Sequence, residues 1–150
     1  MINYDFWKNK KVLITGHTGF KGSWLGIFLK SLDCEIFGLS RETIEGIYQK
    51  ANLKSIYSQE FFNDISIQNF TENFKEIKKI NPDIVFHFAA QSLVYKGYQD
   101  PLDTLNSNII GTFQVLNEIS KCSNTKSAIV STTDKVYKNS EFDNVEESPL

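Results

Sequence analysis

Short apolar runs alternate along the chain with longer stretches whose apolar residues recur at intervals of three and four. The short runs are residues 11–15, 35–39, 60–62, 83–87 and 126–131. Runs of this kind are typical of strands that are buried on both faces of a sheet. The longer stretches, residues 20–32, 66–80 and 102–122, have the spacing of amphipathic helices. Residues 41–58 predict a loop with some helix, and the acidic residues 139–150 a further loop.

Apolar side chains on the predicted helices indicate which parts contribute to the core. In the first helix they are Trp24, Leu25, Phe28, Leu29 and Leu32, and in the third Leu105, Ile109, Phe113, Leu116 and Ile119. We expect Trp24, Phe28 and Phe113 to be buried on this spacing. The second helix is expected to end at Asn81-Pro82, because proline disfavours the helical conformation in the residue before it.

The alternation of strands and helices predicts parallel strands that are joined by right-handed crossovers. We therefore expect an α/β protein with a Rossmann-type, doubly wound parallel sheet in the strand order 3-2-1-4-5. By its length, the segment 1–150 is expected to form one domain.

Three glycines, Gly16, Gly19 and Gly22, lie in the turn between the first strand and the first helix. At this spacing the first permits a tight turn, the second lets the backbone approach a pyrophosphate, and the third lets the helix pack close to the sheet. The free N–H groups and the dipole at the start of the helix favour an anion. Because a strand precedes the turn and a helix follows it, the pattern predicts a phosphate-binding loop, the alternative being a glycine turn without a ligand.

Composition and charge exclude several classes of function. The formal net charge is -2 and no stripe of Lys or Arg occurs, so we expect no nucleic-acid partner. No apolar run reaches the roughly 18 residues of a membrane span, and residues 1–11 lack the apolar core of a signal peptide. Cys34 and Cys122 have no His nearby at metal-binding spacing, so we expect buried reduced thiols and no metal. Together these features predict a cytoplasmic protein.

Five motifs, in order along the chain, resemble those of the extended short-chain dehydrogenases. They are Thr15-Gly16-x-x-Gly19-Phe20-x-Gly22, Asp64-Ile65, His87-Phe88-Ala89-Ala90-Gln91, Asn108-x-x-Gly111-Thr112 and Ser131-Thr132-Thr133-Asp134-Lys135-Val136-Tyr137. The last is similar to the nucleotide-sugar 4,6-dehydratase branch. Within that branch, Phe6-Trp7-Lys8, the glycine turn and Lys135 resemble the CDP-glucose 4,6-dehydratases.

This resemblance implies a dinucleotide that lies across the glycine turn and the ends of neighbouring strands. Its binding residues would be Gly16, Thr18, Gly19, Phe20, Lys21, Ser40, Arg41, Asp64, Ile65, Phe88, Ala89, Ala90, Gln91 and Ser107. Taken alone, Ser40-Arg41 after the second strand favours NADP, because an Arg there accommodates the 2′-phosphate. The resemblance favours NAD, which is the cofactor we expect.

The resemblance also implies a lyase that converts a CDP-hexose, a nucleotide-sugar substrate, to its 4-keto-6-deoxy form in deoxysugar biosynthesis. Its catalytic residues would be Thr133, Asp134 and Lys135. Thr133 would hydrogen-bond the C4 oxygen and Asp134 would protonate the leaving C6 hydroxyl; alternatively, both simply begin a turn after the strand. Lys135 either removes the C5 proton, which requires a lowered pKa, or positions an oxygen, or lies in solvent.

Three polar residues of the motifs have alternative roles. His17 either donates to a phosphate or lies at the surface. His87 is expected in the core, because it ends an apolar strand. Asn108 is disfavoured in the middle of a helix, so we expect it to be structural, with a buried hydrogen bond to a neighbouring strand.

No tyrosine from Tyr48 onward begins the Tyr-x-x-x-Lys pair that the family uses for its hydride step. Gln99 lies four residues after Tyr95, and Glu141 lies four residues after Tyr137. We therefore interpret the sequence as the amino-terminal portion of a longer homo-oligomeric enzyme, inactive by itself. Alternative interpretations are another nucleotide-sugar epimerase or dehydratase, or a non-catalytic dinucleotide-binding module.

Overall fold

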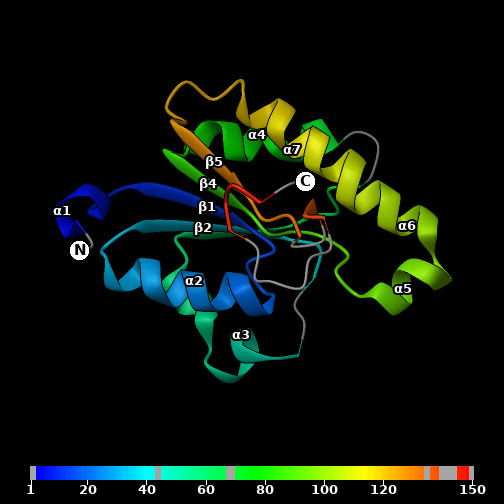
Figure 1. Cartoon of the computed structure of the whole chain (residues 1–150). Coiled ribbons are helices and arrows are strands. Elements are labelled where there is room, and N and C mark those ends of the chain that lie inside the picture. The colour runs from blue at the N-terminus through cyan, green and yellow to red at the C-terminus, as the bar shows by residue number, and fades with distance from the viewer. Residues whose placement is uncertain (1–2, 43–44, 67–69, 134–135, 139–144, 149–150) are drawn as a thin grey trace.

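A five-stranded parallel sheet forms the centre of the molecule (Figure 1). The computed structural model describes residues 3–42, 45–66, 70–133, 136–138 and 145–148. The strands are β1 (Lys11–Thr15), β2 (Glu35–Ser40), β3 (Gln59–Phe62), β4 (Ile84–His87) and β5 (Ser127–Val130). Every neighbouring pair is parallel, and the order is β3-β2-β1-β4-β5. The predicted fold and strand order are therefore confirmed.

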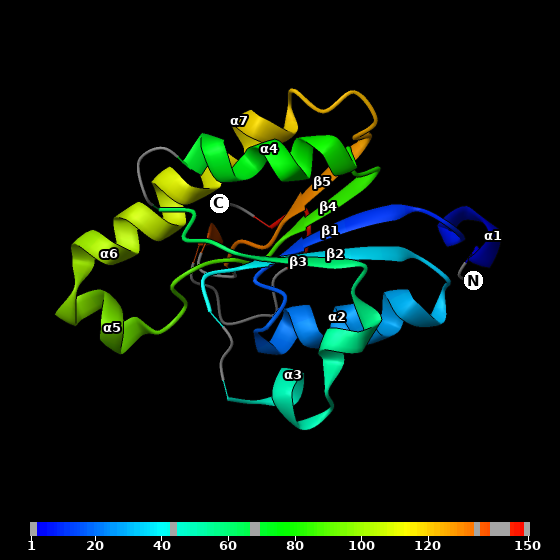
Figure 2. The same ribbon diagram turned by 180° about the vertical axis from the view of Figure 1, so that it is seen from behind.

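Helices cover both faces of this sheet. They are α1 (Tyr4–Trp7), α2 (Phe20–Ser31), α3 (Ile47–Lys50), the 3-10 helix η1 (Leu53–Ile56), α4 (Phe70–Ile80), α5 (Val94–Gln99), α6 (Pro101–Leu105), the π-helix η2 (Asn106–Gly111) and α7 (Thr112–Ile119). In two opposite views, α4 and α7 lie on one face, and α2 and α3 on the other (Figures 1 and 2). The long helix predicted at residues 102–122 thus divides into α6, η2 and α7, and α5 was not predicted.

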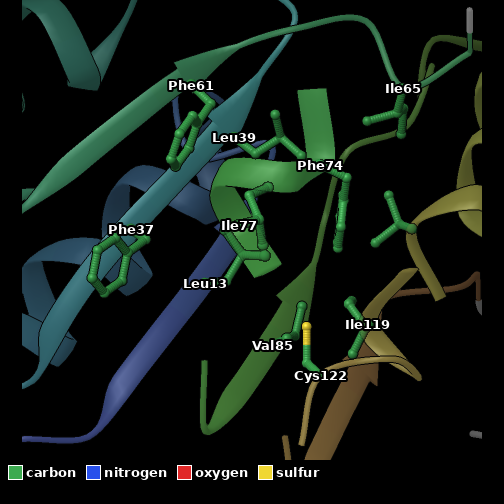
Figure 3. Close-up of a cluster of buried hydrophobic side chains, with 11 residues drawn as sticks. Leu13, Phe37, Leu39, Phe61, Ile65, Phe74, Ile77, Val85, Ile119 and Cys122 are labelled. Carbon is green, nitrogen blue, oxygen red and sulfur yellow. The ribbon is translucent and has the colours of Figure 1, made fainter. Parts of the chain in front are cut away.

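The core has two layers because successive residues of each buried strand point to opposite faces. On β1, Leu13 packs toward α4 and α7, whereas Val12 and Ile14 pack toward α2. Figure 3 shows the first of these layers, in which Leu13, Phe74 and Ile77 lie side by side. Burial of both faces explains the continuous apolar runs of the central strands β1, β2 and β4, whereas the outer strands β3 and β5 are partly exposed.

The expectation that Trp24, Phe28 and Phe113 belong to the core is wrong. Their side chains are 53%, 43% and 65% exposed. The buried side of α2 instead carries Gly22, Ser23, Gly26 and Leu29. Gly22 lets the helix pack against the glycine turn and Gly26 lets it pack against Tyr57, whereas the bulky side chains face outward. On α7 the buried residues are Val115, Glu118 and Ile119. The other residues of the apolar stripe predicted for this region are exposed, namely Leu105, Ile109, Phe113 and Leu116.

The two cysteines are free and buried, as predicted. Among the described residues, no helix is both long and apolar enough to cross a membrane.

Candidate functional site

A cleft of about 630 Å³ opens where the carboxyl ends of the strands meet the loops that follow them. Every residue predicted to bind a cofactor lines it. The lining comprises Gly16, Thr18, Gly19, Phe20, Lys21, Gly22, Ser40, Arg41, Glu42, Asn63, Asp64, Ile65, Phe88, Ala89, Ala90, Gln91, Ser92, Leu93, Ser107, Ser131 and Thr132. In a sheet of this order, ligands bind at the carboxyl edge where the strand order reverses, here between β1 and β4.

The glycine turn between β1 and α2 is shaped by two close backbone approaches. Gly16 has a φ of +73°, and a Cβ there would lie 2.8 Å from the backbone nitrogen of Ala89. A Cβ at Gly22 would lie 2.3 Å from the carbonyl oxygen of Gly16. Both positions therefore exclude a side chain, which lets β1, α2 and the end of β4 converge.

The amino terminus of α2 points its backbone donors toward this cleft. Gly19 is the N-cap residue and contributes no capping side chain, and the first turn holds no acidic residue. A helix start of this kind retains unpaired N–H groups and the positive end of the dipole. It therefore suits a phosphate group.

The loop after β4 is held from the side by the π-helix η2. Asn108 accepts a hydrogen bond from the N–H of Gln91 at 2.7 Å and donates to the carbonyl of the same residue at 2.9 Å. The structural role predicted for Asn108 is therefore confirmed, although its partner follows the strand. Ser107, the preceding residue, is buried against the cleft.

The end of the cleft beside β2 and β3 carries charge. Arg41 follows β2, and its Nη1 lies 3.4 Å from Asp64 and 3.3 Å from Asp103. Partial burial alone would raise the pKa of Asp64, but hydrogen bonds from Ser66 and the charge of Arg41 outweigh it and hold the pKa below its ordinary value. Asp64 is therefore a carboxylate at neutral pH.

His17 does not face a phosphate and does not lie at the surface, so both alternatives from the sequence are wrong. Its side chain is fully buried below the glycine turn. Its Nε2 lies 2.9 Å from Glu60 and its Nδ1 lies 2.9 Å from the hydroxyl of Ser40. Tyr48 also donates to Glu60. Burial lowers the pKa of His17 despite this carboxylate. No local pattern predicted the cluster, since its members are up to 43 residues apart.

His87, by contrast, is the predicted core residue. It is 2% exposed and lies between the hydroxyls of Thr15, at 2.7 Å, and Thr112, at 2.9 Å. Burial lowers its pKa to about 4. The imidazole is therefore neutral at physiological pH and ties β1 and β4 to α7.

The predicted catalytic segment follows β5. Thr133 is exposed, whereas Asp134 and Lys135 lie outside the described residues. Two residues that the prediction omitted, Ser131 and Thr132, line the cleft, and Ser131 accepts a hydrogen bond from Lys21 at 3.2 Å. This contact places the end of β5 beside the start of α2.

One Tyr-x-x-x-Lys spacing does occur in the chain, at Tyr4 and Lys8. It belongs to α1, which lies at the amino end of the sheet, on the opposite side from α5 and α6 (Figure 1). Tyr4 is 64% exposed there. This pair is therefore remote from the cleft and does not complete it.

The sheet order, the glycine turn and the cleft define a Rossmann-type α/β protein, the class that binds nucleotides at this edge. Residues 13–150 match the family described as GDP-mannose 4,6 dehydratase. The chain therefore belongs to this family, and its predicted resemblance to nucleotide-sugar dehydratases is confirmed.

A relative and two solved structures illustrate the similarity. The CDP-glucose 4,6-dehydratase of Salmonella typhimurium is 35% identical over 144 residues, which is 95% of this chain and 39% of the relative. The UDP-Glc/GlcNAc 4-epimerase of Campylobacter jejuni gives a TM-score of 0.76 at 28% identity, over 95% of this chain and 43% of that one.

The third is a UDP-glucose-4-epimerase from Stenotrophomonas maltophila with bound NAD and formylated UDP-arabinopyranose. It gives a TM-score of 0.77 at 22% identity, over 94% of this chain and 42% of that one, and shows the common fold. The chain thus spans about two fifths of the length of these proteins.

Proposed function

We propose that this chain is the dinucleotide-binding part of a nucleotide-sugar 4,6-dehydratase that uses NAD and acts on a CDP-hexose. The observation that carries the proposal is the convergence of all the predicted cofactor residues on one cleft at the carboxyl edge of the sheet. Family membership and the 35% identity to a CDP-glucose 4,6-dehydratase support the substrate class.

The residues of the cleft fit a dinucleotide. Gly16 and Gly19 line the cleft without a side chain, and the uncapped start of α2 offers a pyrophosphate N–H donors. Asp64 and Ile65 would border the adenine, while Phe88, Ala89 and Ala90 would border the nicotinamide half.

When bound, the nicotinamide would accept a hydride from C4 of the sugar and return it to C6. The proton of the C4 hydroxyl would go to the tyrosine of the family's Tyr-x-x-x-Lys pair, and the groups that follow β5 would move the others. Thr133 would hold the C4 oxygen, and Asp134 would protonate the hydroxyl that leaves C6 as water. Lys135 would remove the C5 proton or position an oxygen. A general acid at this position would contribute about 10²–10⁴-fold in rate.

We also propose that the protein is a homo-oligomer. The described part of the chain exposes apolar side chains along one side of α6, η2 and α7, including Leu105, Ile109 and Phe113. The outer strand β5 is exposed as well. Apolar patches and unpaired strand edges favour association.

Binding is tested with the full-length protein by titration calorimetry with NAD. Gly19→Val should abolish binding, because its side chain would enter the path of the pyrophosphate. A Cβ at Gly19 would lie 3.2 Å from the carbonyl oxygen of Gly16, which is a tight contact. Urea unfolding of the variant therefore checks that a loss of binding does not come from a loss of the fold. Gly46→Val is the matched control, because nothing lies within 4 Å of a Cβ there. Undiminished NAD affinity in Gly19→Val would contradict the proposed site.

Activity is tested by incubating the full-length protein with NAD and CDP-glucose and detecting the 4-keto product by its absorbance in alkali. We expect product from the native protein and a loss of about 10²–10⁴-fold in kcat for Asp134→Asn. The structural similarity to 4-epimerases makes an epimerase the second candidate function. Formation of a C4-epimer without a 4-keto-6-deoxy product would favour that candidate and contradict ours.

A further inference from the structure

Arg41 links the loops after β2 and β3 to helix α6 at the β2 side of the cleft. It follows β2 directly, while Asp64 follows β3 and Asp103 belongs to α6. Its Nη1 lies within 3.4 Å of a carboxylate oxygen of each aspartate. The guanidinium is 47% exposed, and Asp103 is 34% exposed. The contacts therefore form a charged cluster at the cleft's rim, hereafter the Arg41 cluster.

The position of Arg41 matters for the choice of cofactor. In this fold the residue after the second strand lies beside the adenosine ribose, and an Arg there binds the 2′-phosphate of NADP. Both Arg41 and Asp64 line the cleft. A free guanidinium at this place would favour NADP, as the sequence alone indicates.

The two carboxylates change that preference. One positive and two negative groups give the Arg41 cluster a formal charge of -1. A 2′-phosphate carries a charge of about -2, as phosphate monoesters do near neutral pH. Arg41 meets both aspartates through Nη1, so a phosphate bound by the rest of its guanidinium would lie near two like charges. The ribose hydroxyls of NAD are uncharged, so the two aspartates do not repel them.

We propose that Asp103 is a specificity-determining residue that, together with Asp64, makes this site select NAD over NADP by occupying Arg41. The proposal rests on the dinucleotide site proposed above. Asp103 acts through Arg41, as a positioning residue, and does not line the cleft. It is also the better residue to vary, because Asp64 is itself expected to contact the cofactor.

The test measures the dissociation constants of NAD and NADP for the full-length protein at low ionic strength. Four proteins form a double-mutant cycle: native, Asp103→Asn, Arg41→Gln and the double variant. Asn preserves the shape of Asp103, and Asp100 still caps α6. We expect native protein to bind NAD more tightly, and Asp103→Asn to shift the affinity ratio toward NADP by about three- to tenfold.

Two further results are expected if the cluster acts as proposed. The shift caused by Asp103→Asn should be smaller when it is measured in the Arg41→Gln background, because the phosphate then has no guanidinium to meet and only its repulsion by Asp103 is relieved. It should also shrink at high salt, since the charges are partly exposed. Asp33→Asn is the matched control: it removes the same charge after α2, at the amino edge of the sheet. Asp33 has a φ of +57°, which Asn adopts readily. This control should leave the ratio unchanged.

Retained NAD binding with an unchanged ratio in Asp103→Asn would overturn this inference alone. So would an equal shift in the double variant, because Arg41 would then have no part in it. Failure of the native protein to bind either dinucleotide would overturn the proposed function as well, so the two failures are distinguishable.

Discussion

The buried imidazole of His87 makes the stability of this protein depend on pH in a defined window. Its pKa is lowered from 6.5 to about 4 by burial. In the unfolded chain the group regains its ordinary pKa. Between these two values the unfolded state binds a proton that the folded state does not. The contribution of His87 is therefore fully present above pH 6.5 and is lost as the pH falls toward 4.

A tenfold change in a protonation equilibrium corresponds to about 1.4 kcal/mol, so the loss from His87 is on the order of 3 kcal/mol. The assay is urea unfolding of the native protein and His87→Gln at several values between pH 7 and pH 4. Gln keeps a polar side chain between Thr15 and Thr112 but does not titrate there. We expect His87→Gln to be less stable than the native protein at pH 7. Between pH 7 and pH 4, the native protein should lose about 3 kcal/mol more of its free energy of unfolding than the variant does.

His17, whose pKa is also lowered, titrates in both proteins and cancels from the comparison. Parallel pH profiles for the two proteins would refute the reasoning. If His87→Gln does not fold, the imidazole resonances of the native protein decide the question. A His87 that titrates near 6.5 in the folded state would contradict the burial argument.

Three further predictions concern packing and reactivity. Gly22→Ala should lower the free energy of unfolding, measured in urea, by about 1–3 kcal/mol, because its Cβ would meet the backbone of Gly16. Gly46→Ala is the control and should leave this free energy unchanged. Tyr57→Phe should change stability by less than about 1 kcal/mol or raise it, because this buried hydroxyl has no hydrogen-bond partner within the described part of the chain. A marked loss in the same assay would reveal a partner. Burial and the charge of a neighbouring aspartate raise the pKa of the Cys34 thiol to about 11. Cys34 should therefore react with a thiol reagent at pH 8 far more slowly in the folded than in the unfolded protein, and equal rates would show that the thiolate is accessible.

The sequence by itself determined the order and type of the main elements. The strand Lys11–Thr15 and the glycine turn that joins it to α2 could be predicted, because both signals depend on neighbouring residues only. The parallel order follows from that alternation and from the rule of right-handed crossovers. The family motifs also predicted that Asp64 and Gln91 share one site, and both line the cleft.

The tertiary structure alone decided which side of each helix is buried and which charges meet. The periodicity of α2 shows where its side chains point relative to one another. Only the packed structure shows that the side with Gly22 and Gly26 is buried and that Trp24 faces outward. The burial of His17 against Glu60 and the capture of Arg41 by Asp103 join residues that are 43 and 62 positions apart. Such contacts depend on how the chain packs in three dimensions, so no local pattern in the sequence encodes them.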